Sequence, residues 1–135
     1  MDGCLFCRIV AGEIPATRVH EDERTVAFLD LFPASRGHLL VVPRAHAADA
    51  LEADPEDLAA CARVAAELGT RARARLGADG ITLQTNAGAA AGQTVFHLHV
   101  HVVPRYADGP RMLAWQPGAA TPDELAALAE ALRAD

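Results

Sequence analysis

A chain of 135 residues is long enough for one domain with a buried core and short for two, so we expect a single domain over residues 1–135. With 51% hydrophobic and 22% charged residues, the composition excludes an intrinsically disordered chain. A formal net charge of −6 leaves no basic field for a polymeric phosphate backbone. This argues against nucleic-acid binding as the main role and leaves room for a small phosphorylated ligand.

The amino-terminal segment has neither the basic region nor the apolar stretch of a signal peptide, and no apolar run reaches the length of a membrane span. We therefore expect a cytoplasmic protein that does not contact membranes. Three cysteines is an odd number, and Cys4 and Cys7 form a Cys-x-x-Cys pair. In a reducing compartment this spacing favours metal binding or redox chemistry over a structural disulfide.

Three strands are predicted in the first part of the chain. Residues 17–22 and 25–31 are rich in β-formers and are separated by a short polar turn, which predicts a hairpin. A third strand is predicted over 37–42, before Pro43, which lacks the amide donor that a central ladder needs. A loop that contains His46 follows.

A long amphipathic helix is predicted from residue 55 to near Gly77. Asp54 can cap its amino terminus, and Pro55 suits its first position. Apolar residues recur at steps of three and four, which places them on one face of the helix. They are Leu58, Cys61, Ala65, Leu68, Ala72 and Leu76.

Two further strands, 80–86 and 96–103, are joined by a loop rich in glycine and alanine. Near the end of the chain, Thr121 and Glu124 form a capping box before an amphipathic helix that contains Leu125, Leu128 and Leu132. Strands that flank one long helix, without regular βαβ alternation, predict an α+β fold. We expect an antiparallel sheet of about five strands, one face of which is covered by one or both helices.

The densest chemical signal is a run of three histidines, His97, His99 and His101, that alternate with apolar residues. In an extended strand these side chains would share one face at intervals of about 6.5 to 7 Å. Packing explains such a row poorly, because each buried ring would need a polar partner. Neutral imidazole can attack phosphorus near neutral pH, and neighbouring imidazoles can orient it or transfer protons. A site that only binds a metal is the alternative interpretation.

This run resembles the signature of the histidine-triad (HIT) family of nucleotide hydrolases and transferases, His-φ-His-φ-His-φ-φ with φ apolar, which residues 97–103 match in full. Segments at 6–16, 28–33, 37–46 and 86–97 also look like parts of that family, so the resemblance covers nearly the whole chain. It implies a HIT-like fold, more closely a Hint-like bacterial HIT protein with a zinc site. It also implies a purine nucleotide substrate and a homodimer.

The resemblance implies a mechanism as well. His99 would attack the phosphorus bonded to the nucleoside of an adenosine phosphoramidate or a related substrate, and water would hydrolyse the resulting nucleotidyl-histidine without a catalytic metal. His101 and His38 would be its acid–base and orienting partners, and Asp30 would bind the ribose hydroxyls. The other residues expected around the nucleotide are Phe6, Ile9, Phe28, Leu29 and Leu31 at the base, and Asn86, Gly92, Gln93 and Thr94 at the phosphate and leaving group.

Cys4, Cys7, His46 and His97 form a second group of candidate ligands. Two thiolates at this spacing and two imidazoles suit a closed, tetrahedral zinc site of the structural type. The bacterial members that the chain is most similar to place zinc at these positions. His97 would then be structural and unavailable as a nucleophile. An empty dithiol is the alternative.

Several alternatives stay open at this stage. A diadenosine-polyphosphate hydrolase would use His99 on an anhydride bond, whereas a nucleotide-binding interaction protein with vestigial catalysis would bind nucleotides without turnover. A zinc-dependent nucleic-acid binder is disfavoured by the acidic charge. Asp30 can also be a plain turn residue before Pro33, and the glycine-rich loop can equally be a plain hairpin connection or a phosphate cradle.

Overall fold

The computed structural model describes residues 3–110 and 117–133. Five strands form one sheet in the order β1-β2-β3-β5-β4, and all neighbouring strands are antiparallel. This confirms the predicted α+β fold with a five-stranded antiparallel sheet. The elements in chain order are α1 (Leu5–Val10), β1 (Arg18–Glu21), β2 (Thr25–Leu29), β3 (Leu39–Pro43), α2 (Pro55–Leu76), β4 (Gly80–Gln84), the 3-10 turn η1 (Ala89–Ala91), β5 (Val100–Arg105) and α3 (Pro122–Arg133).

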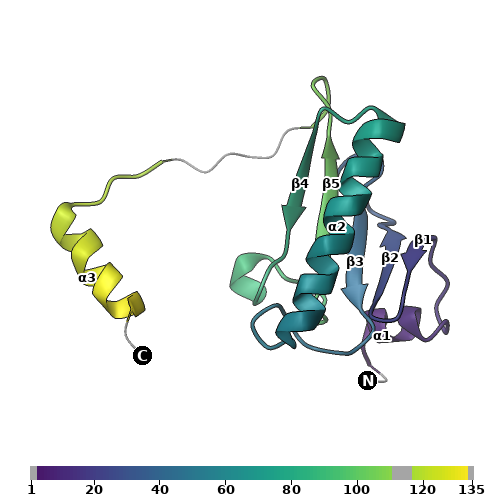
Figure 1. Ribbon diagram of the computed structural model, residues 1–135, viewed down its shortest axis with the longest axis horizontal. Coiled ribbons are helices and arrows are strands. Elements are labelled where there is room, and N and C mark those ends of the chain that lie inside the picture. The colour runs from purple at the N-terminus through teal and green to yellow at the C-terminus, as the bar shows by residue number, and fades with distance from the viewer. Residues whose placement is uncertain (1–2, 111–116, 134–135) are drawn as a thin grey trace.

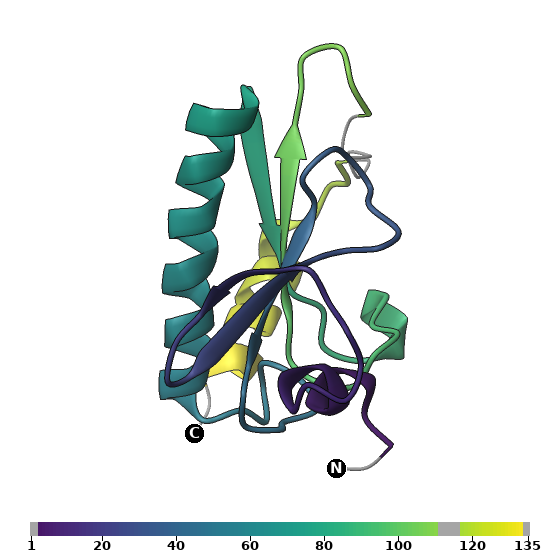
Figure 2. The same ribbon diagram turned by 90° about the vertical axis from the view of Figure 1, so that its right-hand side faces the viewer.

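The sheet separates two small cores, because side chains alternate between its faces along each strand. Helix α2 covers one face and α1 lies on the other (Figure 2). The α2 side buries Ala27, Leu39, Val41, Val100 and Val102 against Cys61, Val64, Ala65 and Leu68. The α1 side buries Val26, Phe28, Leu40 and Val42 against Phe6 and Ile9. Every residue of the central strand β3 is buried.

Helix α2 begins and ends where the sequence predicts. The Asp54 side chain accepts a hydrogen bond from the Glu56 amide, and Pro55 occupies the first turn. Gly77 ends the helix in the left-handed conformation, with φ of 73°, which glycine adopts without steric cost. The predicted apolar face packs on the sheet.

Helix α1 was not predicted from the sequence. Its six residues are too few to form a stable helix alone. The Cys4 thiolate or thiol accepts from the Cys7 amide as a cap, while Phe6 and Ile9 are buried against the sheet. Tertiary packing therefore determines this helix, and it places the Cys-x-x-Cys pair beside the sheet.

Strand β5 begins at Val100 and not at residue 96, which corrects the prediction of three histidines in one strand. The Leu98 amide donates to the Ala47 carbonyl, so the preceding segment follows the loop after β3. His97 and His99 thus lie before the strand, and only His101 lies within it. The three histidines therefore do not lie in one strand.

The carboxy-terminal helix α3 forms as predicted but covers no face of the sheet. It stands apart from the sheet and from α2 (Figure 1). The expectation that one or both helices cover one face is therefore met by α2 alone. Within the described ranges, no helix is both long and apolar enough to cross a membrane.

Candidate active site and metal centre

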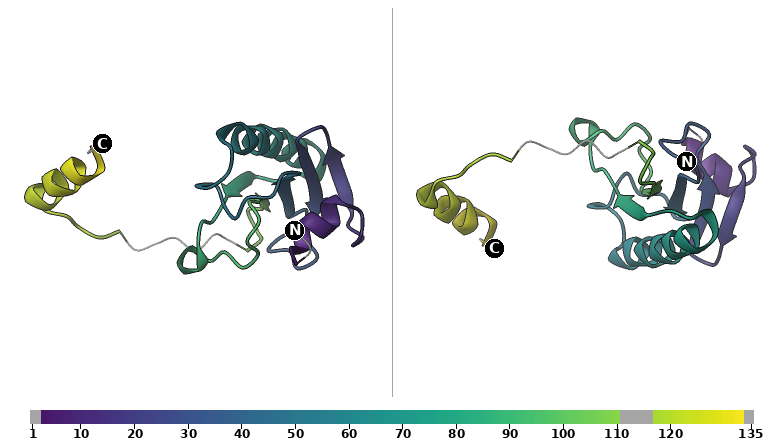
Figure 3. Two further views of the ribbon diagram at one scale, coloured as in Figure 1. Left: turned by 90° about the horizontal axis from the view of Figure 1, so that it is seen from below. Right: turned by 90° about the horizontal axis from the view of Figure 1, so that it is seen from above.

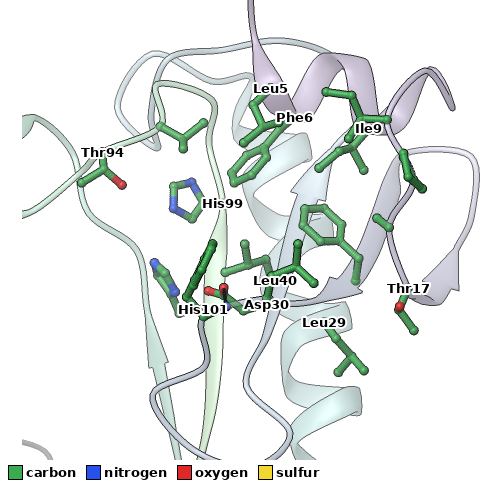
Figure 4. A pocket seen from close by; sticks show the side chains of 17 residues that line it. Leu5, Phe6, Ile9, Thr17, Leu29, Asp30, Leu40, Thr94, His99 and His101 are labelled. Carbon is green, nitrogen blue, oxygen red and sulfur yellow. Dashed lines mark hydrogen bonds between the residues drawn. The ribbon is translucent and has the colours of Figure 1, made fainter.

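A cavity of about 450 Å³ opens on the α1 side of the sheet. Apolar side chains surround one part of it, while His99, His101 and Thr94 lie together at another (Figure 4). Nine of the residues predicted from the sequence as catalytic or nucleotide-binding line this cavity. They are Phe6, Ile9, Phe28, Leu29, Asp30, Leu31, Thr94, His99 and His101.

Other lining residues were not predicted as site residues. Leu40 could have been found from strand alternation, because it pairs with Phe28 on one side and with His101 on the other, and all three share a face. The remainder come from loops and from α1, whose positions the sequence alone does not indicate. They are Leu5, Ile14, Pro15, Ala16, Thr17, Phe32 and Val95.

His99 presents an unprotonated nitrogen to this cavity. Its Nδ1 lies 2.8 Å from the His97 carbonyl oxygen, which can only accept a hydrogen bond. Nδ1 therefore carries the proton, and Nε2 keeps its lone pair. Burial lowers the pKa of His99. The Phe6 ring packs edge-on against the His99 ring, with 5.0 Å between the two ring centroids. The ring is neutral, oriented and available as a nucleophile.

His38 and His101 form a hydrogen-bonded chain that begins at the backbone. The Ala34 amide donates to His38 Nδ1 at 2.9 Å, so His38 carries its proton on Nε2. That Nε2–H donates to His101 Nδ1 at 3.0 Å, which leaves the His101 proton on its own Nε2. His101 is thereby fixed as a hydrogen-bond donor.

Both rings of this chain stay neutral near pH 7. Burial lowers the pKa of His38. Burial, reinforced by His99 and His38, lowers the pKa of His101 to about 4. A protonated His101 would place a second N–H against the N–H of His38, so the geometry also opposes its protonation.

Asp30 stabilises a turn and also lines the cavity. Its Oδ1 accepts from the Phe32 amide at 2.8 Å, and its Oδ2 lies 3.7 Å from His38 Nε2. The carboxylate is half-buried, and Oδ2 has lone pairs left for a ligand. Asp30, His38 and His101 have the spacing of a metal-binding group, but both nitrogens of His38 already have partners.

The loop before Thr94 is held by a buried glutamine. Gln93 Oε1 accepts from the Gly88 amide at 2.8 Å, while Nε2 donates to the carbonyls of Ala48 and Val95 at 2.6 and 3.0 Å. Asn86 accepts from the Gln84 amide group, and Gly92 adopts φ of 95° at the end of η1. The structure brings Thr94 to the cavity and places Asn86, Gly92 and Gln93 in the loop that leads to it.

Cys4, Cys7, His46 and His97 converge beside the amino terminus of α1. The Cys7 sulfur lies 3.3 Å from His46 Nδ1 and 3.4 Å from His97 Nδ1, and the two Nδ1 atoms are 3.3 Å apart. All four ligand atoms lie within 4.8 Å of one another. The sequence predicted this group, although its members come from three separate segments.

These separations fit a tetrahedral zinc ion. Bond lengths of about 2.3 Å to sulfur and 2.05 Å to nitrogen imply about 3.6 Å between S and N ligands and about 3.3 Å between two N ligands. His97 Nε2 donates to the Pro43 carbonyl at 2.9 Å, so its Nδ1 is unprotonated and faces the two sulfurs. The donor set and the tautomer of His97 both suit the metal.

Comparison with known proteins assigns the chain to a family. The model of the HIT domain matches residues 11–108, and the chain belongs to the HIT family. An uncharacterized HIT-like protein of Mycobacterium tuberculosis is 46% identical over 101 residues, which cover 75% of this chain and 70% of that protein. An adenylylsulfatase of Arabidopsis thaliana is 40% identical over 103 residues, covering 76% of this chain and 52% of the plant protein.

Solved structures share the fold. The SMU.412c protein of Streptococcus mutans has a TM-score of 0.92 and 40% identity, with 98% of this chain and 85% of that chain covered. A Zn-bound histidine triad family protein of Mycobacterium smegmatis has a TM-score of 0.78 and 39% identity, with 96% of this chain and 98% of that chain covered. A hypothetical histidine triad nucleotide-binding protein of Sulfolobus tokodaii has a TM-score of 0.75 and 38% identity, with 96% of this chain and 89% of that chain covered.

Proposed function

We propose that this protein is an enzyme that hydrolyses nucleotides at the phosphorus bonded to the nucleoside, with His99 as the nucleophile. The observation that carries the proposal is the hydrogen bond from His99 Nδ1 to the His97 carbonyl, which leaves Nε2 unprotonated at the cavity. The nucleotide-binding relative from Sulfolobus tokodaii and the adenylylsulfatase from Arabidopsis thaliana support a nucleotide substrate.

The cavity suggests how a nucleotide would bind. The base would lie among the apolar side chains, which include Phe6, Ile9 and Phe28, and Asp30 Oδ2 would accept hydrogen bonds from the ribose hydroxyls. The phosphate would then lie near His99 and Thr94. Gln93 would act as a positioning residue, because both polar atoms of its side-chain amide are already hydrogen-bonded to backbone atoms.

In the proposed reaction, His99 Nε2 forms a bond to phosphorus as the bond from phosphorus to the leaving group breaks. The leaving group departs with the electron pair, and an amine leaving group takes a proton from solvent, which regains one when water attacks in the second step. A nucleotidyl-histidine remains after the first step. Water then attacks the same phosphorus, releasing the nucleoside monophosphate and restoring the neutral imidazole. Two displacements in line give net retention at phosphorus. His101 Nε2–H would donate to a phosphoryl oxygen throughout.

The substrate we propose first is an adenosine phosphoramidate, which would give AMP and an amine. A second candidate is adenylyl sulfate, and a specific observation favours it. His38 cannot resupply a proton to His101, because His38 Nδ1 already accepts from the Ala34 amide. Sulfate leaves without needing a proton, whereas an amine must take one. Diadenosine polyphosphates are the third candidate class.

We also propose that Cys4, Cys7, His46 and His97 hold a structural zinc ion and that the protein is a homodimer. The zinc-bound relative from Mycobacterium smegmatis supports the metal. The ion would link α1, which lines the nucleoside cavity, to the segment that carries His97 and His99. Its effect on the chemistry would be to hold these two parts together.

The test is a comparison of kcat/KM for AMP release from an adenosine phosphoramidate, adenylyl sulfate and diadenosine tetraphosphate. The wild type is compared with His99→Ala and with His20→Ala, a histidine on β1 outside the cavity. We expect turnover of at least one substrate by the wild type and the control and none by His99→Ala. Nucleotide binding with equal turnover in all three proteins would instead support an interaction protein with vestigial catalysis.

A further inference from the structure

The turn between β2 and β3 fixes the protonation of the hydrogen-bonded pair His38 and His101. The Ala34 amide belongs to this turn and donates to His38 Nδ1 at 2.9 Å, which keeps the proton of that ring on Nε2. His38 Nε2–H donates to His101 Nδ1 at 3.0 Å, so the His101 proton lies on its own Nε2. One backbone amide therefore selects the tautomers of two rings.

A second arrangement of these protons is available when the amide is moved away. His38 Nδ1 could then carry the proton, and His38 Nε2 would accept from a proton on His101 Nδ1. His101 Nε2 would be left with a lone pair, which cannot donate to a phosphoryl oxygen. The turn therefore decides whether His101 presents a donor or an acceptor to the cavity that it lines.

Ser35, the residue after Ala34, anchors the turn to the end of β5. Its side chain is buried, and its hydroxyl donates to the Pro104 carbonyl, 69 residues along the chain. The carbonyl has no proton to give, so the hydroxyl is the donor. The Ser35 carbonyl accepts from the His38 amide at 3.1 Å. Ser35 thus ties β5 to both sides of the contact between Ala34 and His38.

Tyr106 and Arg36 hold the same turn from the end of the sheet and from α2. The Tyr106 hydroxyl donates to the Arg36 carbonyl at 2.8 Å, and the Arg36 side chain donates to the Leu76 carbonyl at 3.2 Å. Leu76 is the last residue of α2, which lies on the face of the sheet opposite α1 (Figure 3). The turn is therefore anchored from the α2 side, while His101 lines the cavity on the α1 side.

From these contacts we propose that Ser35 and Tyr106 are positioning residues for the histidine pair. By holding the turn, their hydroxyls keep the Ala34 amide on His38 Nδ1 and the proton of His101 on Nε2. Neither Ser35 nor Tyr106 lines the cavity, so both act through the two rings. The use of that proton on a phosphoryl oxygen rests on the proposed function, whereas the tautomers belong to the free protein.

Nitrogen-15 NMR of the histidine rings tests the proposal on the free protein, because protonated and unprotonated ring nitrogens give distinct signals. In the wild type we expect His38 and His101 each as one tautomer, protonated at Nε2. Ser35→Ala and Tyr106→Phe should each add a form of His38 that is protonated at Nδ1, with the larger population in Ser35→Ala. Wild-type ring signals in both variants would overturn the proposal.

Two further variants make the comparison specific to the turn. Tyr106→Phe removes a single oxygen, so it decides the test alone if Ser35→Ala does not fold. Thr70→Val is the matched control, because the Thr70 hydroxyl also donates to a carbonyl, that of Ala66, but within α2. The control should leave the ring signals of His38 unchanged. Changes of equal size in the control would contradict a role specific to the turn.

Kinetics with the substrate that the wild type turns over connect the tautomers to the reaction. We expect kcat to fall about tenfold in Ser35→Ala and about threefold in Tyr106→Phe, with KM within about twofold, because misplacement of the donor affects the chemical step. Ser35→Thr keeps the hydroxyl and should recover most of the rate. A loss that appears only in KM, or equal losses in the alanine and threonine variants, would contradict the proposal. A wild type that turns over none of the substrates would refute the proposed hydrolysis, and the ring signals would still decide the role of the turn.

Discussion

His97 and His99 are two residues apart, and each donates one hydrogen bond to a backbone carbonyl, yet they serve different regions of the molecule. His97 donates from Nε2 to Pro43, which turns its Nδ1 towards Cys4, Cys7 and His46. His99 donates from Nδ1 to the His97 carbonyl, which leaves its Nε2 for the nucleoside cavity. The backbone acceptor selects the tautomer, and the tautomer decides whether a ring suits the metal cluster or the reaction.

The two rings can adopt different tautomers because the chain is irregular between 95 and 99. In a regular strand the carbonyls would be paired within the sheet, and alternate rings would share one environment. Because β5 begins only at Val100, the carbonyl of His97 can accept from the ring of His99.

The largest effect is expected at the cavity. His99→Ala removes the proposed nucleophile, so we expect AMP release to fall by at least about 10³-fold. Nucleotide affinity, measured by titration calorimetry, should change little, because the base and ribose contacts remain. If the variant keeps more than a tenth of the wild-type kcat, another group performs the attack and the distinction between the two histidines fails.

The next largest effect is expected at the metal cluster. With free zinc at about 1,000 times its dissociation constant, binding stabilises the folded state by about 4 kcal/mol. For a domain of this size this corresponds to a shift of Tm on the order of 10 °C. We expect chelation and Cys7→Ser to lower Tm by this amount in scanning calorimetry, with bound zinc measured by mass spectrometry.

Arg8→Ala is the matched control for that experiment, because Arg8 is exposed on α1 beside Cys7. It should keep both zinc and Tm. A purified protein that holds zinc, loses it to a chelator and melts at the same temperature would show that the cluster does not stabilise the fold.

A smaller effect is expected at His38, which orients His101 without lining the cavity. His38→Ala should lower kcat by about 10²-fold and leave KM nearly unchanged, because the donor to the phosphoryl group is no longer fixed. His38→Gln can place an amide N–H near the position of Nε2 and should recover part of the rate. Equal rates for the alanine and glutamine variants would argue against a positioning role.

The smallest effect is expected outside both regions, in the turn between β1 and β2. The Asp22 carboxylate is hydrogen-bonded to the His20 ring. It also accepts hydrogen bonds from the backbone amides of Arg24 and Thr25 and from the Thr25 hydroxyl. Asp22→Ala should lower the free energy of unfolding by about 1 kcal/mol in urea titration. The exposed neighbour Glu23 serves as control, and Glu23→Ala should have almost no effect.

The same carboxylate predicts a pH dependence of stability. The hydrogen bond with His20, followed by those from Arg24 and Thr25, holds the pKa of Asp22 well below its usual range. A carboxylate with a lowered pKa stabilises the folded state above its unfolded value and loses this contribution as the pH falls. The difference in unfolding free energy between wild type and Asp22→Ala should therefore shrink below about pH 4. A difference that is constant from pH 7 to pH 3 would contradict this assignment.

Much of the fold follows from local signals in the sequence. The helix from Pro55 is marked by its cap, its proline and its apolar spacing, and all three operate within the helix itself. The ends of the strands were predicted less accurately. The second strand was predicted over 25–31 but ends at Leu29, because Asp30 accepts a hydrogen bond from the Phe32 amide and the chain turns there. Helix α1 depends on burial of Phe6 and Ile9 against the sheet, which no local pattern reveals.

The residues of the site were predictable as a set but not in their geometry. The histidine motif identifies His99, and the Cys-x-x-Cys pair identifies two of the four candidate ligands. The protonated nitrogen of each ring is set by distant carbonyls and amides, such as Pro43 for His97 and Ala34 for His38. Gln93 was predicted as a nucleotide contact, and its side chain binds backbone groups of Gly88 and Val95 in its own loop and of Ala48 after β3, which no local pattern reveals.

The central claim is that His99 Nε2 forms a covalent bond to phosphorus. Rapid acid-free quenching of the wild type with an adenosine phosphoramidate or adenylyl sulfate, followed by intact-mass analysis and peptide mapping, tests it most directly. We predict an adenylyl adduct on His99, attached at Nε2, that is absent from His99→Ala. An adduct on another residue, or turnover with no adduct under conditions that trap the first step, would contradict it.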